Sequence, residues 1–245
     1  MKKIKTTWVD PISMKYHLKQ WDKTKESTKD FYEFIKDYLN PENTIIDIGS
    51  GAGSVTAYLA KKKSKVNFIG VEYEEKLVKL ANTISKKKSI KNVTFELGNM
   101  FNLSKKNNID GVISLQTISW VDNFEKPLKQ IFNKLNPNWV AITGLFYQGD
   151  ISCRVEVEEF TKGSRKVYYN TYSIPAVERF CLLFNYKISI VEPFNLSIDL
   201  KKPKNLNILG TYTEKVKQMD SSFKRIQISG PLLLNWHTIL IEKNV

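Results

Sequence analysis

Residues 44–57 read TIIDIGSGAGSVTA, an apolar run that breaks into glycines and then resumes with helical spacing. The run at 44–48 is typical of a strand that is buried on both faces. The break carries three glycines at alternate positions, Gly49, Gly51 and Gly53. Such glycines allow a tight turn and let a ligand lie against bare main chain, while the following helix directs free N–H groups into the turn. We therefore expect a strand, a ligand-binding turn and a helix.

A carboxylate stands at the end of the next apolar run, where residues 68–72 read FIGVE. Glu72 follows the glycine turn by about one βα unit, which is the spacing expected of an acid that binds ribose hydroxyls. The turn and the acid together predict a nucleoside-binding site.

Length and composition narrow the class of protein. The chain has 245 residues, enough for one α/β domain with modest additions. No stretch approaches the roughly 18 uninterrupted apolar residues of a membrane span, and the basic N-terminus is not followed by an apolar signal core. Cys153 and Cys181 are the two cysteines and have no metal-ligand spacing. We expect a cytoplasmic protein without a membrane span or a metal site.

The net charge of +13 raises the question of a nucleic-acid partner. Four of the 38 basic residues are arginines, at positions 154, 165, 179 and 225. Arginine recognises phosphates and bases with more geometric specificity than lysine does. The charge therefore favours a basic surface that attracts small anions over a nucleic-acid interface.

Strands and helices alternate after an N-terminal helical part. Helices are expected from Asp10-Pro11 to Trp21 and from Glu26 to Leu39. Strands are then expected near 44–48, 66–71, 92–97, 109–115 and 139–146, with helices near 54–63, 74–88 and 123–135. This alternation predicts a parallel sheet with helices on both faces.

The pattern changes after Gly149. We expect a hairpin over 151–172 that turns at Lys162-Gly163-Ser164, and a helix that begins at Ser173 and ends near Phe184. Strand-like runs follow at 186–198 and 232–242, with a short strand near 224–228. We expect one domain over 1–245, made of a helical cap (1–40), a cofactor-binding core (41–147) and a substrate-side part (148–245).

The glycine turn excludes two common nucleotide-binding loops. A dinucleotide fingerprint needs its third glycine where this chain has Ser54, and a P-loop would end in Gly-Lys-Ser/Thr. Residues 47–53, DIGSGAG, instead resemble the D/E-x-G-x-G-x-G loop of class I S-adenosylmethionine-dependent methyltransferases of the small-molecule type, and the resemblance covers roughly 40–147. It implies an α/β, Rossmann-like, seven-stranded and mostly parallel sheet whose last strand is antiparallel. The implied cofactor is S-adenosylmethionine, with S-adenosylhomocysteine as product.

The resemblance also implies roles for individual residues. Asp47 would lie beneath the amino group of the cofactor, Glu72 would accept hydrogen bonds from both ribose hydroxyls, and Asn99 would contact the adenine amino group. The full set implied to bind the cofactor is Asp47, Gly49, Ser50, Gly51, Gly53, Glu72, Tyr73, Asn99, Met100, Phe101 and Gln116.

The acceptor is less constrained by the sequence. The loop after the fourth strand reads LQTI and lacks the Asp/Asn-Pro-Pro-Tyr/Phe signature of many enzymes that methylate nucleobase or amide nitrogens. A small metabolite follows as the expected substrate, an anionic one such as a sugar or a nucleotide-linked sugar, methylated at oxygen. The alternatives are an RNA methyltransferase, supported by charge, and a non-catalytic scaffold that binds the cofactor.

A hydroxyl acceptor usually needs a base. His237 near the start of the last strand and His17 in the N-terminal helix are the two histidines, and a structural role is the alternative for each. The expected substrate-binding residues are Tyr16, Trp120, Tyr147, Gln148 and Trp236. The number of chains in the active assembly is left open.

Overall fold

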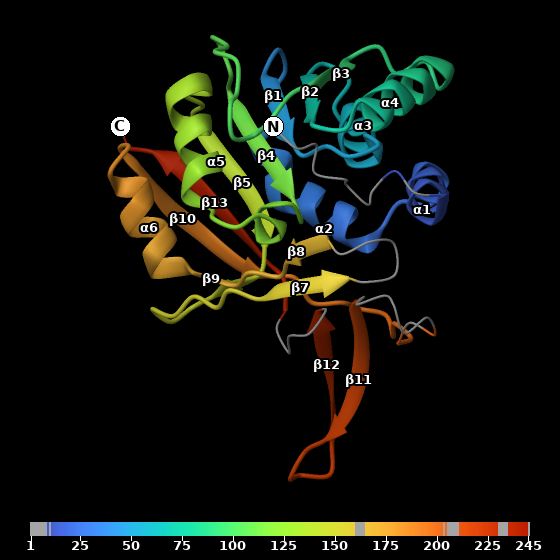
Figure 1. Cartoon of the computed structure of the whole chain (residues 1–245), viewed down its shortest axis with the longest axis vertical. Helices are drawn as coiled ribbons and strands as arrows, with labels where there is room; N and C mark the ends of the chain where they lie inside the picture. Colours follow the sequence, from blue (N-terminus) through green and yellow to red (C-terminus); the bar gives the residue numbers. More distant parts are fainter. Residues whose placement is uncertain are drawn as a thin grey trace.

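A computed structural model describes residues 9, 11–159, 165–202, 204, 211–229 and 235–244 (Figure 1). Its helices are α1 (Pro11–Asp22), α2 (Glu26–Ile35), α3 (Ser54–Lys62), α4 (Glu75–Lys87), α5 (Glu125–Gln130) and α6 (Ile174–Leu182). Short helical turns are η1 (Lys36–Tyr38), η2 (Ile118–Trp120) and η3 (Ile131–Leu135).

The central sheet has seven strands in the order β10-β13-β5-β4-β1-β2-β3. These strands are β1 (Thr44–Ile48), β2 (Asn67–Glu72), β3 (Val93–Leu97), β4 (Gly111–Leu115), β5 (Trp139–Gly144), β10 (Tyr186–Pro193) and β13 (His237–Lys243). Strand β13 runs antiparallel to both of its neighbours, β5 and β10, and the other pairs are parallel. The predicted Rossmann-like sheet with an antiparallel last strand is confirmed.

The alternation of side chains in β1 shows why helices cover both faces of the sheet. Ile46 and Ile48 belong to a core on one face that includes residues of α5 and α6, such as Leu128. Ile45 points to the other face and packs in a core that includes Phe31 of α2 and residues of α3 and α4. All three isoleucines are fully buried, as expected for a central parallel strand.

Pairs of short strands lie outside the central sheet, beyond its carboxyl edge. They are β7 (Glu156–Glu159) with β8 (Arg165–Tyr168), β6 (Phe146–Tyr147) with β9 (Tyr172–Ser173), and β11 (Thr211–Lys217) with β12 (Phe223–Ser229). The predicted hairpin after the fifth strand is confirmed as β7 and β8, and its predicted turn at 162–164 lies outside the described residues.

Three boundaries differ from the sequence prediction. The strand predicted at 186–198 ends at Pro193, and the strand predicted near 224–228 is the longer β12. Its partner β11 was not predicted, because TYTEKVK is polar and its outer residues are exposed. The helix predicted at 123–135 is continuous but changes from α5 into the π-helical turn η3. Within the described residues, no helix is long and apolar enough to cross a membrane.

Candidate active site

The glycine turn joins β1 to α3 through left-handed backbone. Gly49, Gly51 and Gly53 have φ values of +77°, +57° and +81°, a region that side chains disfavour. A Cβ on Gly49 would collide with Thr117, and one on Gly53 would meet the Phe95 ring at 2.5 Å. These two glycines are therefore required by close packing.

Gly51 differs from its neighbours because no heavy atom lies within 4 Å of the position that its Cβ would take. Its bare main chain faces open space at the carboxyl edge of the sheet. A cradle of this kind is what a nucleoside needs in order to approach a backbone N–H group. The turn thus fits the adenosyl cofactor that the sequence motif implies.

The Glu72 carboxylate lies directly behind this cradle. Its Oε2 accepts a hydrogen bond from Gly51 N at 2.8 Å, and its Oε1 accepts one from Glu74 N at 2.9 Å. Burial raises the pKa of Glu72, and these backbone hydrogen bonds oppose the rise. The acid and the turn that were separated in the sequence are therefore in direct contact.

Asp47 points to the opposite side of the turn, toward α3. It is 3% exposed, and its Oδ2 accepts a hydrogen bond from Thr56 Oγ1 at 2.6 Å. Burial raises the pKa of this carboxyl to about 7, although the Thr56 hydroxyl favours the charged form. The role of Asp47 beneath the cofactor amino group stays a prediction.

The loops after β3 and β4 bring the remaining cofactor candidates to the same edge. Asn99 Oδ1 accepts a hydrogen bond from Phe101 N at 2.9 Å, and the half-buried Met100 packs against the core. Gln116 has a φ of +56°, which is uncommon for a residue with a side chain, and its N–H donates to Thr143 O at 2.9 Å. Gln116 therefore turns the chain sharply at the end of β4, next to Thr117 and the glycine turn.

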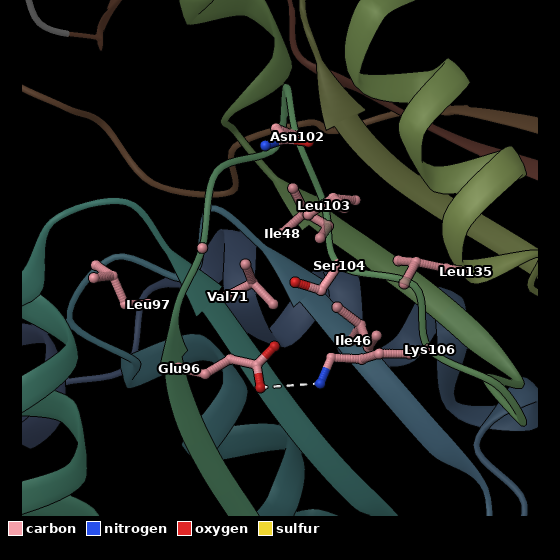
Figure 2. Close-up of a pocket in the computed structure, with 11 residues that line it drawn as sticks. Ile46, Ile48, Val71, Glu96, Leu97, Asn102, Leu103, Ser104, Lys106 and Leu135 are labelled. Carbon is pink, nitrogen blue, oxygen red and sulfur yellow. Dashed lines mark hydrogen bonds and ion pairs between the residues drawn. The ribbon is translucent and has the colours of Figure 1, made fainter.

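A small cavity of about 40 Å³ lies under the loop that follows β3 (Figure 2). Its walls include Ile46, Val71 and Leu103, and the Glu96 carboxylate and Lys106 Nζ form an ion pair of 3.0 Å beside it. A space of this size accommodates about one or two water molecules. This cavity is too small for an adenosyl group. It lies beneath the loop that carries Asn99.

Helix α1 contacts the glycine turn from outside. Trp21 Nε1 donates to Ala52 O at 2.8 Å, and Ser54 Oγ lies 3.3 Å from Gln20 Oε1. His17 lies one turn before Trp21 on α1, and its ring centroid is 5.9 Å from that of Tyr16. The helical cap thus brings both N-terminal candidates to the cofactor side of the molecule.

A family profile described as "Methyltransferase domain" matches residues 39–172. The chain belongs to this family. The match includes the glycine turn, Glu72 and the loops after β3 and β4. Residues 39–172 therefore form a methyltransferase domain, built on the class I, Rossmann-like sheet that S-adenosylmethionine-dependent methyltransferases share.

Curated relatives share only part of their length with this methyltransferase. Malonyl-(acyl-carrier protein) O-methyltransferase from Bacillus cereus is 28% identical over 102 residues, which are 42% of this chain and 37% of that protein. A tRNA (guanine-N(7)-)-methyltransferase from Prochlorococcus marinus is 34% identical over 110 residues, covering 41% of this chain and 51% of that protein. Neither similarity extends over the whole relative.

Solved structures match over nearly the full chain. An S-adenosylmethionine-dependent methyltransferase from Clostridium acetobutylicum has a TM-score of 0.58 at 10% identity, covering 96% of this chain and 99% of the other. Another from Aquifex aeolicus has a TM-score of 0.57 at 15% identity, covering 93% and 97%. At these identities the likeness shows the fold.

The residues predicted to bind or deprotonate the acceptor near the last strand lie at and beyond the end of β5. His237 begins β13 and pairs with Gly144 at the end of β5, so its position is at the carboxyl edge. Its Nδ1 lies 3.1 Å from Asn235 O, and burial lowers its pKa. Tyr147 and Gln148 are exposed just after the same edge.

An apolar cluster covers this edge and contains the two predicted tryptophans. Trp236 is 4% exposed and belongs to the cluster of Leu145, Tyr169 and Phe194. Trp120 packs beside it, with its ring centroid 4.3 Å from that of Tyr169. Trp236 is buried and Trp120 is half-buried, and direct contact with substrate stays a prediction for each.

Two buried polar residues that sequence reasoning missed join the chain around η2 to its neighbours: Asn170 connects it to the residues flanking the β7–β8 hairpin, and Ser119 connects it to the end of β5. Asn170 Oδ1 accepts from Val155 N at 3.1 Å, and its Nδ2 donates to Val121 O at 2.8 Å. Ser119 Oγ accepts from Leu145 N at 2.7 Å. Neither residue lies in a recognisable motif, so only the folded chain reveals their role.

We expect Glu72→Gln to weaken binding of S-adenosylhomocysteine roughly tenfold or more, because an amide N–H₂ group would face a backbone donor and the charged acceptor would be lost. Isothermal calorimetry measures the affinity. Glu74→Gln is the matched control, since only the backbone N–H of Glu74 contacts Glu72. Equal losses in the two variants would refute a specific role for Glu72.

Asp47 should make the protein less stable as the pH rises. A carboxyl whose pKa is 3.8 before folding and about 7 in the folded state stabilises the fold below pH 3.8 and loses this contribution as the pH rises through about 7. Asp47→Asn should flatten the fall in the free energy of unfolding over this window, as measured by urea denaturation. The exposed Asp37→Asn should leave the slope in place, and an unchanged slope in Asp47→Asn would contradict the prediction.

Proposed function

We propose that this enzyme methylates an oxygen of a small anionic acceptor bound at the carboxyl edge of β4 and β5. The observation that carries the proposal is a buried histidine at this edge, His237, whose Nδ1 lies beside the carbonyl of Asn235. A base is needed for a hydroxyl and much less for a neutral amine, so its presence favours oxygen.

The tautomer of His237 supports this role. A carbonyl oxygen accepts hydrogen bonds and cannot donate them, so the 3.1 Å contact to Asn235 O requires the proton on Nδ1. Nε2 then keeps its lone pair. Because burial lowers the pKa of His237, the ring is neutral near pH 7 and can take a proton from an acceptor hydroxyl. His17 on α1 is the second candidate for this step.

The cofactor supplies a methyl group already activated on a sulfonium, so the protein must mainly align it with the acceptor. We assign cofactor binding to the glycine turn at 49–53, to Glu72 and to the loops with Asn99 and Gln116. The Glu72 carboxylate would accept from ribose hydroxyls, while Gly51 leaves room for the sugar.

The surroundings of the edge support a small and anionic acceptor. The hairpin of β7 and β8 and the apolar cluster around Trp236 cover the sheet beside β5, and such a roof suits a substrate held away from water. The net charge of +13 attracts anions. Tyr147 and Gln148 are the exposed side chains with which we expect the acceptor to make contact.

A tRNA substrate is the second candidate. It is favoured by the 34% identity to a tRNA (guanine-N(7)-)-methyltransferase over 110 residues. The similarity covers 41% of this chain, and the scarcity of arginine argues against it.

His237→Gln should lower kcat by about 10²- to 10⁴-fold, the usual contribution of a general base. In the unsubstituted enzyme the rate should rise with pH, with a midpoint below the ordinary value of 6.5, because burial disfavours the imidazolium. The variant should lose this acidic limb in a pH profile of kcat/KM. If His17→Gln loses the limb and His237→Gln keeps it, the base is His17.

The acceptor class can be tested with methyl-labelled S-adenosylmethionine and separate pools of small molecules and total RNA. We expect label in small molecules that an anion exchanger retains. Label in RNA would establish the second candidate. Label in neutral or cationic metabolites would overturn the anionic acceptor while leaving methyl transfer in place.

A further inference from the structure

A hairpin arm extends from the same edge of the sheet as the active site. We call β11, β12 and the turn at 218–222 the basic arm. The chain leaves the sheet at Pro193 of β10 and returns at His237 of β13, and these two residues are paired beside Gly144. Everything between them therefore starts from the carboxyl edge, and in Figure 1 the two strands project away from the body.

The segment just before the basic arm contacts both of its strands. Asp199 Oδ1 lies 2.7 Å from Arg225 Nε, and Asp199 Oδ2 lies 3.0 Å from Lys215 Nζ. Thr213 N donates to Leu200 O at 3.0 Å. These contacts reach the cross-strand pair Lys215–Arg225, and the turn at 218–222 lies beyond them.

The tip of the arm is apolar and exposed. Met219 is fully exposed, with 106% of its reference area, and Phe223 is 68% exposed. Val216 is 40% exposed one residue further from the turn. Large apolar side chains gathered at the end of a projecting element indicate a contact with an apolar phase or partner.

Basic side chains lie immediately behind this tip. The cross-strand pairs from the turn inward are Lys217 with Phe223, Val216 with Lys224, and Lys215 with Arg225. These pairs carry four cations, of which Lys215 and Arg225 form ion pairs with Asp199. Strands advance about 3.4 Å per residue, so the three pairs fall within roughly 10 Å of the turn. The arm therefore ends in exposed apolar side chains, Met219 and Phe223, with cations beside Phe223 and one pair further from the turn.

We propose that the basic arm docks on the surface of an anionic lipid bilayer. Met219 and Phe223 would enter the boundary between headgroups and acyl chains, a layer that interfacial elements reach with about 5–10 Å of their depth. Lys217 and Lys224 would then lie at the level of the lipid phosphates, where each lysine adds attraction.

The layering favours a bilayer over the other anionic partners. Sequence-tolerant RNA binding uses several aromatic rings and arginines, whereas the described tip has one ring, Phe223, and Arg225 is tied to Asp199. Met219 and Val216 have no flat ring on which a base can stack.

A protein groove would bind only side chains of a matching shape. A bilayer interface is fluid and accepts apolar side chains of any shape, such as Met219 and Phe223.

Asp220 limits how deeply the basic arm can enter the bilayer. Its carboxylate accepts a hydrogen bond from Ser222 N at 2.9 Å, which holds the turn, and hydrogen bonding lowers its pKa so that the group stays charged. A charge at the tip opposes entry into the hydrocarbon region. The arm therefore rests in the interface, with the carboxyl edge of the sheet on the same side of the molecule as the bilayer.

The test is co-sedimentation of the full chain with vesicles of phosphatidylcholine, with and without phosphatidylglycerol. The unsubstituted protein should bind only the anionic vesicles. Met219→Asp with Phe223→Asp should abolish binding, and since both side chains are exposed these changes should leave the thermal midpoint unchanged. Asp220→Asn should bind more tightly.

The matched charge controls separate the arm from the overall charge. Lys217→Gln with Lys224→Gln should weaken partitioning roughly 25-fold, about fivefold for each lysine. Lys86→Gln with Lys87→Gln removes the same charge from exposed positions on α4 and should have little effect. Equal losses in both pairs would refute the arm as the docking site.

Two further outcomes would overturn the proposal. One is the absence of binding to anionic vesicles, and the other is a tip variant that keeps vesicle binding but loses retention on single-stranded polyuridylate, which would make RNA the partner. Cofactor affinity is measured in parallel. Because bilayer docking does not depend on methyl transfer, either the docking or the acceptor proposal can fail while the other stands.

Discussion

The contact between Glu72 and the glycine turn is the interaction on which the site depends. Left-handed backbone at Gly49, Gly51 and Gly53 lets the chain fold back over the end of β2, so that Gly49 N reaches Val71 O at 2.9 Å and Gly51 N reaches Glu72 at 2.8 Å. The same turn begins α3. One local conformation therefore joins two strands, orients a helix and positions a half-buried acid.

The turn is also surrounded by contacts that keep it in this shape. Thr117 fills the space that a side chain at Gly49 would need, and Phe95 does so at Gly53. Trp21 donates a hydrogen bond to Ala52 from outside. Gly51 alone among the three faces open space, so the packing leaves one gap at the place where a ribose would approach.

Asp47 is buried and Glu72 is half-buried near this turn, and the two acids have different hydrogen-bond partners. Glu72 is held by backbone N–H groups at the open edge, and Asp47 is held by the Thr56 hydroxyl on the side of α3. Burial raises both pKa values, which is a cost to stability near neutral pH. Carboxylates with raised pKa values lower the free energy of unfolding near neutral pH. In a binding site they also provide hydrogen-bond acceptors that are already in position.

The sequence alone determined the core of the fold and the methyltransferase family, because these depend on local patterns. Continuous apolar runs, the glycine spacing at 49–53 and the acid at 72 all act over one βα unit, and the strands predicted at 44–48 and 66–71 are observed at 44–48 and 67–72. Only the tertiary structure decided which residues surround the predicted cofactor site. The left-handed turn at Gln116, the burial of Trp236 and the hydrogen bonds of Asn170 join segments far apart in the chain. Strand β11 was not predicted for a related reason. It forms by pairing with β12, and its own sequence has no apolar pattern typical of a strand.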